Sequence, residues 1–154
     1  MDSPRALGLR FQDNSKLHDD VVLEFAGQEY TCDSYYFALD NRLLPEQEDD
    51  EKIRLVMRRL LEQWLEAARS LSDGSQAFLP FDLSDQCSRW IRCERRGDDF
   101  ALALGWSDTE GWSFSPSDIG ELLFALRNFH ADTPEVVMGG ERFEGLIAES
   151  IAAI

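Results

Sequence analysis

The residue types that most often carry catalysis or bind metals are sparse in this sequence. Its only histidines are His18 and His130, and each has an aspartate nearby, as chance allows in a chain with 30 acidic residues. Neither a Gly-x-Ser-x-Gly nucleophile turn nor a His-x-x-Glu-His metal-binding spacing occurs. The sequence therefore predicts no catalytic residue, no metal site and no cofactor.

One acidic stretch has the alternation of a calcium-binding loop. Glu46, Glu48 and Asp50 stand at alternate positions, where such a loop places its first oxygen ligands. The loop also requires glycine at its sixth position and glutamate at its twelfth, and this chain has Glu51 and Met57 there. We therefore reject a calcium site at these residues.

Asp82 and Asp85 form a second carboxylate pair, in the stretch FDLSD. Two carboxylates at this spacing could exchange protons with a substrate or hold a cation. They could equally form a turn in which aspartate and serine side chains bond to the backbone. A carboxylate-dependent enzyme therefore stays open as one alternative function.

The cysteines indicate a reducing compartment. The chain has three, Cys32, Cys87 and Cys93, and no Cys-x-x-Cys pair. An odd count without that motif is typical of free, buried thiols in a cytoplasmic protein. The N-terminal sequence has no apolar leader, and no apolar run approaches the roughly 20 residues of a membrane helix. We expect a cytoplasmic protein that does not enter membranes.

The net charge of −15 limits the kind of partner. Acidic residues are spread along the whole chain, so the surface should repel nucleic acid and favour a basic protein. The arginines at positions 89, 92, 95 and 96 surround Trp90, a combination that can bind single-stranded nucleic acid. Against the overall charge we predict no nucleic-acid partner.

The clearest predicted element is a long helix over about 49–71, where apolar residues recur every three or four positions. Alternating apolar residues around Gly27 predict a hairpin over 20–32, and a last apolar stripe predicts a helix over 141–153. The strand QAFLPFDL contains Pro80, which predicts an edge position or a bulge. Residues 33–45 fit a short helix or a strand.

The stretch GWSDTEGWSFSPSD, residues 105–118, predicts a hairpin followed by a helix. If residues 107–111 form the loop, Trp106 faces Trp112 across the strands of a meander over 88–114, and both rings pack on one sheet face. Gly111 would supply a positive φ angle in that loop. Ser115 would then cap a helix over 116–129.

Together these elements predict one α+β domain over residues 1–154, with an antiparallel sheet packed by three helices. In composition the chain is similar to bacterial immunity and antitoxin-type proteins, a likeness that carries over no residues. It implies a non-enzymatic module for a basic partner, and we predict Trp106, Asp108, Glu110 and Trp112 as its binding residues. A small-molecule or regulatory domain with a pocket lined by Tyr36 and several tryptophans is the other alternative.

Overall fold

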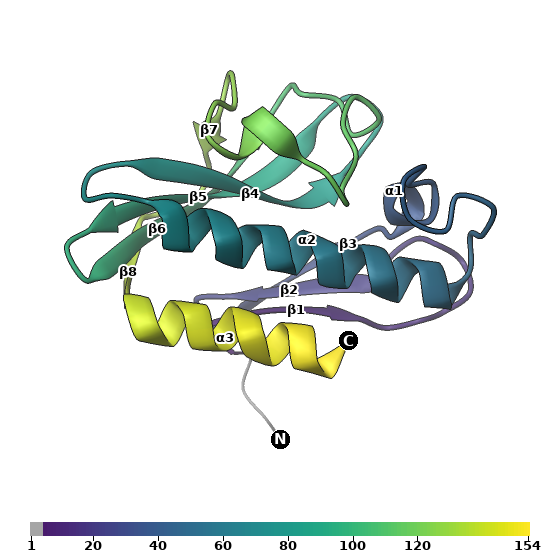
Figure 1. The fold of residues 1–154 in the computed structure, drawn as a ribbon, viewed down its shortest axis with the longest axis horizontal. Helices are drawn as coiled ribbons and strands as arrows, with labels where there is room; N and C mark the ends of the chain where they lie inside the picture. The colour runs from purple at the N-terminus through teal and green to yellow at the C-terminus, as the bar shows by residue number, and fades with distance from the viewer. Residues whose placement is uncertain (1–4) are drawn as a thin grey trace.

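The strands form two antiparallel sheets in a computed structural model that describes residues 5–154 (Figure 1). The first sheet has the order β1 (Leu7–Phe11), β2 (Val21–Phe25), β3 (Gln28–Cys32). The second contains the meander β4 (Gln76–Leu83), β5 (Ser88–Arg96), β6 (Asp99–Ser107). The far edge of β6 pairs with β7 (His130–Ala131) and with β8 (Val136–Gly139).

Two long helices cover the sheets. Helix α2 (Asp50–Ser70) runs across both sheets, and α3 (Gly140–Ala153) lies beside it and against β1 (Figure 1). The start of α2 is fixed by Asp49, whose side chain accepts a hydrogen bond from the Lys52 backbone N–H at 3.1 Å. The predicted helices over 49–71 and 141–153 are confirmed.

A hydrophobic core lies between α2 and the sheets, and a hydrogen bond ties α2 to the irregular strand β4. The indole of Trp64 in α2 is buried, and its N–H donates to the Pro80 carbonyl at 3.0 Å. Pro80 lies in the edge strand β4, whose register shifts between Pro80 and Asp82. The predicted edge position and bulge are both confirmed, and the bulge leaves a carbonyl free for the tryptophan.

The α+β class and its antiparallel sheets are confirmed, but the strands differ from the prediction in two respects. The 20–32 hairpin lies in a separate sheet from the meander. Residues 7–11, where no strand was predicted, form β1, which pairs with β2 from Leu7↔Phe25 to Phe11↔Val21. Residues 33–45 contain a four-residue helix, α1 (Tyr35–Ala38). In the described part of the chain, no helix has the length and apolarity needed to cross a membrane.

The meander predicted over 88–114 ends at Ser107. The prediction that Trp106 faces Trp112 across two strands is therefore wrong. Residues 108–114 turn away across the end of β4, where the Gly111 N–H donates to the Ser84 carbonyl at 2.7 Å. The Ser88 hydroxyl donates a hydrogen bond to the Thr109 carbonyl at 2.6 Å. Gly111 does not have a positive φ angle; a Cβ there would lie 2.6 Å from Ser84 backbone atoms, so glycine permits a close approach.

The predicted helix over 116–129 is also wrong. The segment contains only the 3₁₀ turn η1 (Gly120–Leu123), and Gly120 adopts a φ angle of 69°. Asn128 is likewise left-handed, with φ at 55°. Side chains from elsewhere in the chain take the backbone N–H groups of Ser117 and Ile119. In the predicted helix the Ile119 N–H would have bonded the Ser115 carbonyl, and the Gln63 side chain takes its place.

Candidate functional site

The four predicted binding residues occupy different environments. Trp106 is 40% exposed on β6 and stacks on His130, with ring centroids 4.7 Å apart. The Asp108 carboxylate accepts from the Asn128 amide at 3.2 Å. Glu110 is exposed just before Gly111. Trp112 is 62% exposed and lines a cavity next to α1. The two tryptophans therefore do not share one site.

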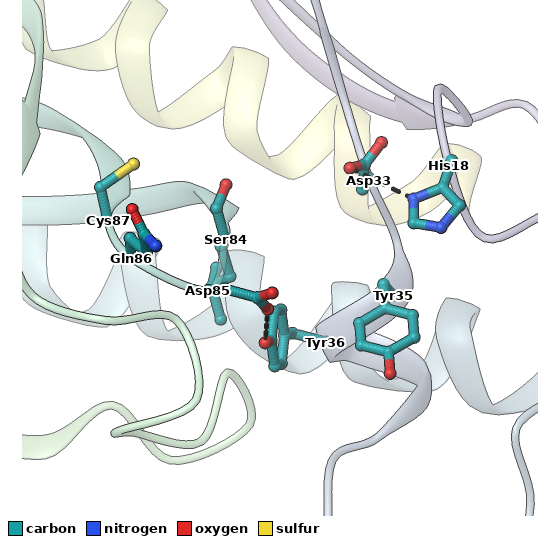
Figure 2. A pocket seen from close by; sticks show the side chains of 9 residues that line it. His18, Asp33, Tyr35, Tyr36, Ser84, Asp85, Gln86 and Cys87 are labelled. Carbon is teal, nitrogen blue, oxygen red and sulfur yellow. Dashed lines mark hydrogen bonds and ion pairs between the residues drawn. The ribbon is translucent and has the colours of Figure 1, made fainter.

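Trp112 belongs to a groove formed by two adjoining cavities on either side of Tyr36. The first, which we call the acidic cavity, measures about 500 Å³ and contains His18, Asp33, Tyr35 and the turn 83–87 (Figure 2). The second, the tryptophan cavity, measures about 370 Å³ and lies between residues 39–41 and 111–116. Tyr36 lines both, and we call the two cavities together the aromatic groove.

Helix α1 presents the aromatic side chains of this groove. The buried carboxylate of Asp20 fixes its start by accepting from the Ser34 N–H at 2.9 Å and from the Ser34 hydroxyl at 2.5 Å. Phe37 and Ala38 then point into the core. Tyr35 and Leu39 are left 39% and 41% exposed. One short helix therefore anchors itself on one side and displays apolar groups on the other.

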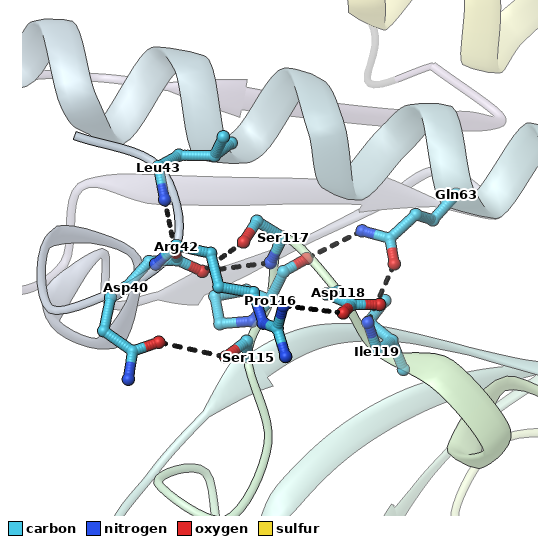
Figure 3. Close-up of polar contacts among 10 residues, drawn as sticks. Asp40, Arg42, Leu43, Gln63, Ser115, Pro116, Ser117, Asp118 and Ile119 are labelled. Carbon is cyan, nitrogen blue, oxygen red and sulfur yellow. Dashed lines mark hydrogen bonds and ion pairs between the residues drawn. The ribbon is translucent and has the colours of Figure 1, made fainter. Parts of the chain in front are cut away.

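Asp40 joins the two walls of the tryptophan cavity (Figure 3). Its Oδ1 accepts from the N–H groups of Arg42 at 2.9 Å and Leu43 at 3.0 Å. Its Oδ2 accepts from the N–H of Ser117 at 3.1 Å and from the Ser117 hydroxyl at 2.6 Å. Its backbone carbonyl accepts from the buried ammonium of Lys52 in α2. These contacts hold the end of α1 against the 115–117 segment.

The same contacts set the charge state of Asp40. Burial by itself would raise its pKa, but the hydrogen bonds from the Ser117 hydroxyl and the backbone N–H groups outweigh burial and lower the pKa below its ordinary value. Helix α2 contacts the same segment through the side-chain amide of Gln63. Its nitrogen donates to the Pro116 carbonyl at 2.9 Å, and its oxygen accepts from the Ile119 N–H at 2.8 Å (Figure 3). Asp40 is thus an ionised structural group.

The carboxylates of the acidic cavity are in a different situation. The hydroxyl of Tyr36 donates to Asp85, and this bond, followed by burial, raises the pKa of Tyr36 to about 12 (Figure 2). Asp33 accepts from the Asp19 N–H at 2.8 Å and lies 3.4 Å from the His18 imidazole. Both carboxylates face an open cavity, so both can meet a ligand from solvent.

Asp82 and Asp85 do not form one site. Asp85 is exposed on the 84–87 turn, whereas Asp82 lies in β4 and lines neither cavity. Burial chiefly raises the pKa of Asp82 to about 6; the charge of Asp33 adds to this, and Arg89 opposes it. Residues 5–154 contain no cluster of three or more histidine, cysteine, aspartate or glutamate side chains placed to hold a metal ion.

Sequence reasoning missed most of the groove because it lies in the segment whose conformation was left open. The pattern DSYYFALD contained one sign of an exposed apolar surface. In a helix Tyr35 and Leu39, four residues apart, share one face, while Phe37 and Ala38 are buried on the other. Tyr36 was a candidate pocket residue and does line both cavities. Comparison of the chain with protein-family models, curated proteins and solved structures gave no match.

Proposed function

We propose that this chain is a non-enzymatic binding module that docks a basic protein in the aromatic groove. The observation that carries the proposal is the exposure of Tyr35, Leu39 and Trp112 around one groove of an acidic chain. Exposed aromatic groups that gather at a concave surface are typical anchors for protein partners. Single exposed apolar residues need no such explanation, but these three converge.

Charge complements the aromatic anchors. Asp33 and Asp85 line the groove, and the net charge of the chain is −15. Such a field speeds the encounter with a basic protein and disfavours acidic ones. Glu110 precedes the Gly111 wall directly and would add to this rim. Asp108 and Trp106, the other two residues predicted to bind, line neither cavity, so the proposed docking site does not include them.

The two exposed tryptophans provide a matched test. Wild-type protein, Trp112→Ala and Trp106→Ala would each be immobilised and exposed to a lysate of the organism that encodes the chain. We expect a basic protein that binds the wild type and Trp106→Ala, and binds Trp112→Ala at least tenfold more weakly. Its dissociation constant should rise with salt. If only Trp106→Ala loses binding, the docking site lies on β6 and not in the aromatic groove. If binding does not depend on salt, charge does not contribute to docking.

A small-molecule ligand is the second candidate. The acidic cavity has a volume in the range of ligand pockets, roughly 300–1,000 Å³, and Tyr36 and Asp85 converge in it. A screen of small cationic and aromatic compounds by the change in unfolding temperature would test this. A compound that stabilises the wild type but not Asp85→Asn would favour the ligand function over protein docking.

A further inference from the structure

The two cavities of the aromatic groove differ in how their carboxylates are satisfied. In the tryptophan cavity, both oxygens of Asp40 accept hydrogen bonds from the chain itself. In the acidic cavity, Asp85 uses Oδ1 for the Tyr36 hydroxyl, and within residues 5–154 no donor reaches its Oδ2. The charge of Asp40 is therefore used internally, whereas that of Asp85 remains available to a ligand.

The acidic cavity also lacks a resident strong cation. Among its described lining residues none is lysine or arginine, and the only group that can pair with Asp33 there is the His18 imidazole, at 3.4 Å. Elsewhere in the chain, carboxylates such as those of Asp118 and Glu144 have arginine partners. The cavity thus keeps two carboxylates whose charge no guanidinium or ammonium within residues 5–154 balances.

Tyr36 lies between the two cavities and lines both, and Tyr35 lines the acidic cavity beside it. Tyr35 and Tyr36 meet edge to face, with ring centroids 5.1 Å apart and planes at 90°. Past Tyr36 the groove presents the apolar side chains of Leu39, Trp112 and Phe114 among polar neighbours such as Asn41 and Ser113. An occupant that follows the groove therefore passes from carboxylates, over a tyrosine ring, to aliphatic and indole surface.

We infer that the partner inserts one arginine into the acidic cavity and one apolar side chain of the same segment into the tryptophan cavity. The inference rests on the proposed function, because it describes how a basic partner would occupy that groove. A guanidinium is favoured over an ammonium for two reasons. Its planar fork can bond a carboxylate such as that of Asp85 through two N–H groups, and its flat face can stack on a tyrosine ring.

Selection of random twelve-residue peptides displayed on phage would test this on the full chain. Wild-type protein should enrich peptides with an arginine and a large apolar residue at a fixed spacing. With Asp33→Asn/Asp85→Asn, the arginine preference should fall at least fivefold while the apolar preference stays. Asparagine keeps an oxygen for the Asp19 N–H and for the Tyr36 hydroxyl, so this variant should fold, which circular dichroism would check.

Two matched variants complete the selection. Asp98→Asn/Asp99→Asn removes the same charge at the β5–β6 turn, where β6 begins, and should leave both preferences unchanged. Trp112→Ser should reduce the apolar preference and keep the arginine. The best peptide and its citrulline analogue would then be compared by fluorescence anisotropy. Citrulline should bind wild type at least tenfold more weakly and should bind Asp33→Asn/Asp85→Asn as well as arginine does.

The outcomes separate this inference from the proposed function. If wild-type protein selects no peptide, both fail. If it selects apolar peptides without arginine, docking in the groove survives and the arginine assignment fails. Lysine enriched as strongly as arginine overturns the preference for a guanidinium. Arginine preference that persists in Asp33→Asn/Asp85→Asn overturns the assignment to this cavity.

Discussion

At the scale of single residues, Trp112 and Trp90 show the widest difference in exposure among the tryptophans. Trp112 is 62% exposed, whereas Trp90 is fully buried and donates its indole N–H to Ser88 at 2.7 Å. We expect Trp112→Ala to lower the free energy of unfolding by less than about 1 kcal/mol, as for an exposed side chain. Trp90→Ala should lower it by about 3–5 kcal/mol, because it leaves a cavity.

Urea denaturation of both variants would measure these two values. A loss of several kcal/mol in Trp112→Ala would mean that the ring packs against the core, as the sequence alone had suggested. The small loss also matters for the binding experiments. It would show that Trp112→Ala tests docking in the groove without disturbing the fold.

Asp82 should make stability depend on pH in the direction opposite to most aspartates. Its pKa in the folded protein is about 6, against the ordinary 3.8, so the folded state binds a proton that the unfolded chain releases. The stability that this proton contributes is complete below pH 4 and is lost as the pH rises through about 6. We expect Asp82→Asn to match wild type near pH 4.5 and to be more stable at pH 8 by about 1–3 kcal/mol.

Unfolding by urea at a series of pH values would test this, with Asp98→Asn as an exposed control that keeps the wild-type pH profile. Equal gains at pH 4.5 and pH 8 would show that the asparagine acts by packing rather than by removing a buried charge. No gain at pH 8 would mean that Arg89 and the backbone N–H of Asp33 fully stabilise the ionised form.

At the scale of elements, two glycines should respond oppositely to alanine. At Gly111 a Cβ would lie 2.6 Å from the Ser84 nitrogen and oxygen, so alanine must push the 108–114 segment away from β4. We expect a loss of about 1–3 kcal/mol, as for other overpacked sites. Gly145 lies inside α3 with nothing within 4 Å of its Cβ position, so alanine there should gain about 0.5–1 kcal/mol.

Thermal unfolding of Gly111→Ala and Gly145→Ala would compare the two changes under one condition. The proposed groove adds a second readout, because Gly111 forms part of a wall of the tryptophan cavity. Gly111→Ala should therefore weaken docking as well as stability, and Gly145→Ala should leave docking unchanged. Stability of Gly111→Ala equal to wild type would contradict the close approach to Ser84.

The elements that sequence predicted correctly are those fixed by local patterns. Helix α2 has an apolar stripe, an Asp49 cap and acidic residues in its first turn, all readable along the chain. The segment 116–129 also had local helix signals, but Asp40 and Gln63 compete for its backbone from 77 and 56 residues away. The groove followed the same rule, since α1 and the Trp112 segment are brought together by contacts that no local pattern encodes.

At the scale of the whole molecule, the three thiols report on how the protein opens. All three are free, with Cys32 and Cys93 buried and Cys87 partly exposed in the acidic cavity. Burial raises the pKa of Cys93 to about 12, and burial together with the charge of Asp82 raises that of Cys32 as well. A thiol reacts as its thiolate, so both buried groups should be inert until the core opens.

We expect one thiol to react quickly with a disulfide reagent in the native protein and two to react slowly, at rates that follow global unfolding. Absorbance would give the rates, and Cys87→Ser should remove the fast phase alone. Alkylation of the unfolded, unreduced chain should modify three cysteines. A single modified cysteine would indicate a disulfide, and a second fast thiol would indicate local opening near Cys32 or Cys93.

The Asp40 contacts have a consequence for the thermodynamics of docking. Because one carboxylate ties the end of α1 to residues 115–117, both walls of the tryptophan cavity are in place before a partner arrives. A preorganised receptor loses little conformational entropy on association, so the ordering cost falls on the partner's segment. Because the pKa of Asp40 is lowered, acid should weaken this preorganised arrangement by protonating the carboxylate. Its stabilising effect is present above the ordinary aspartate range and is lost as the pH falls through the lowered pKa, which weakens the contact between the end of α1 and Ser117.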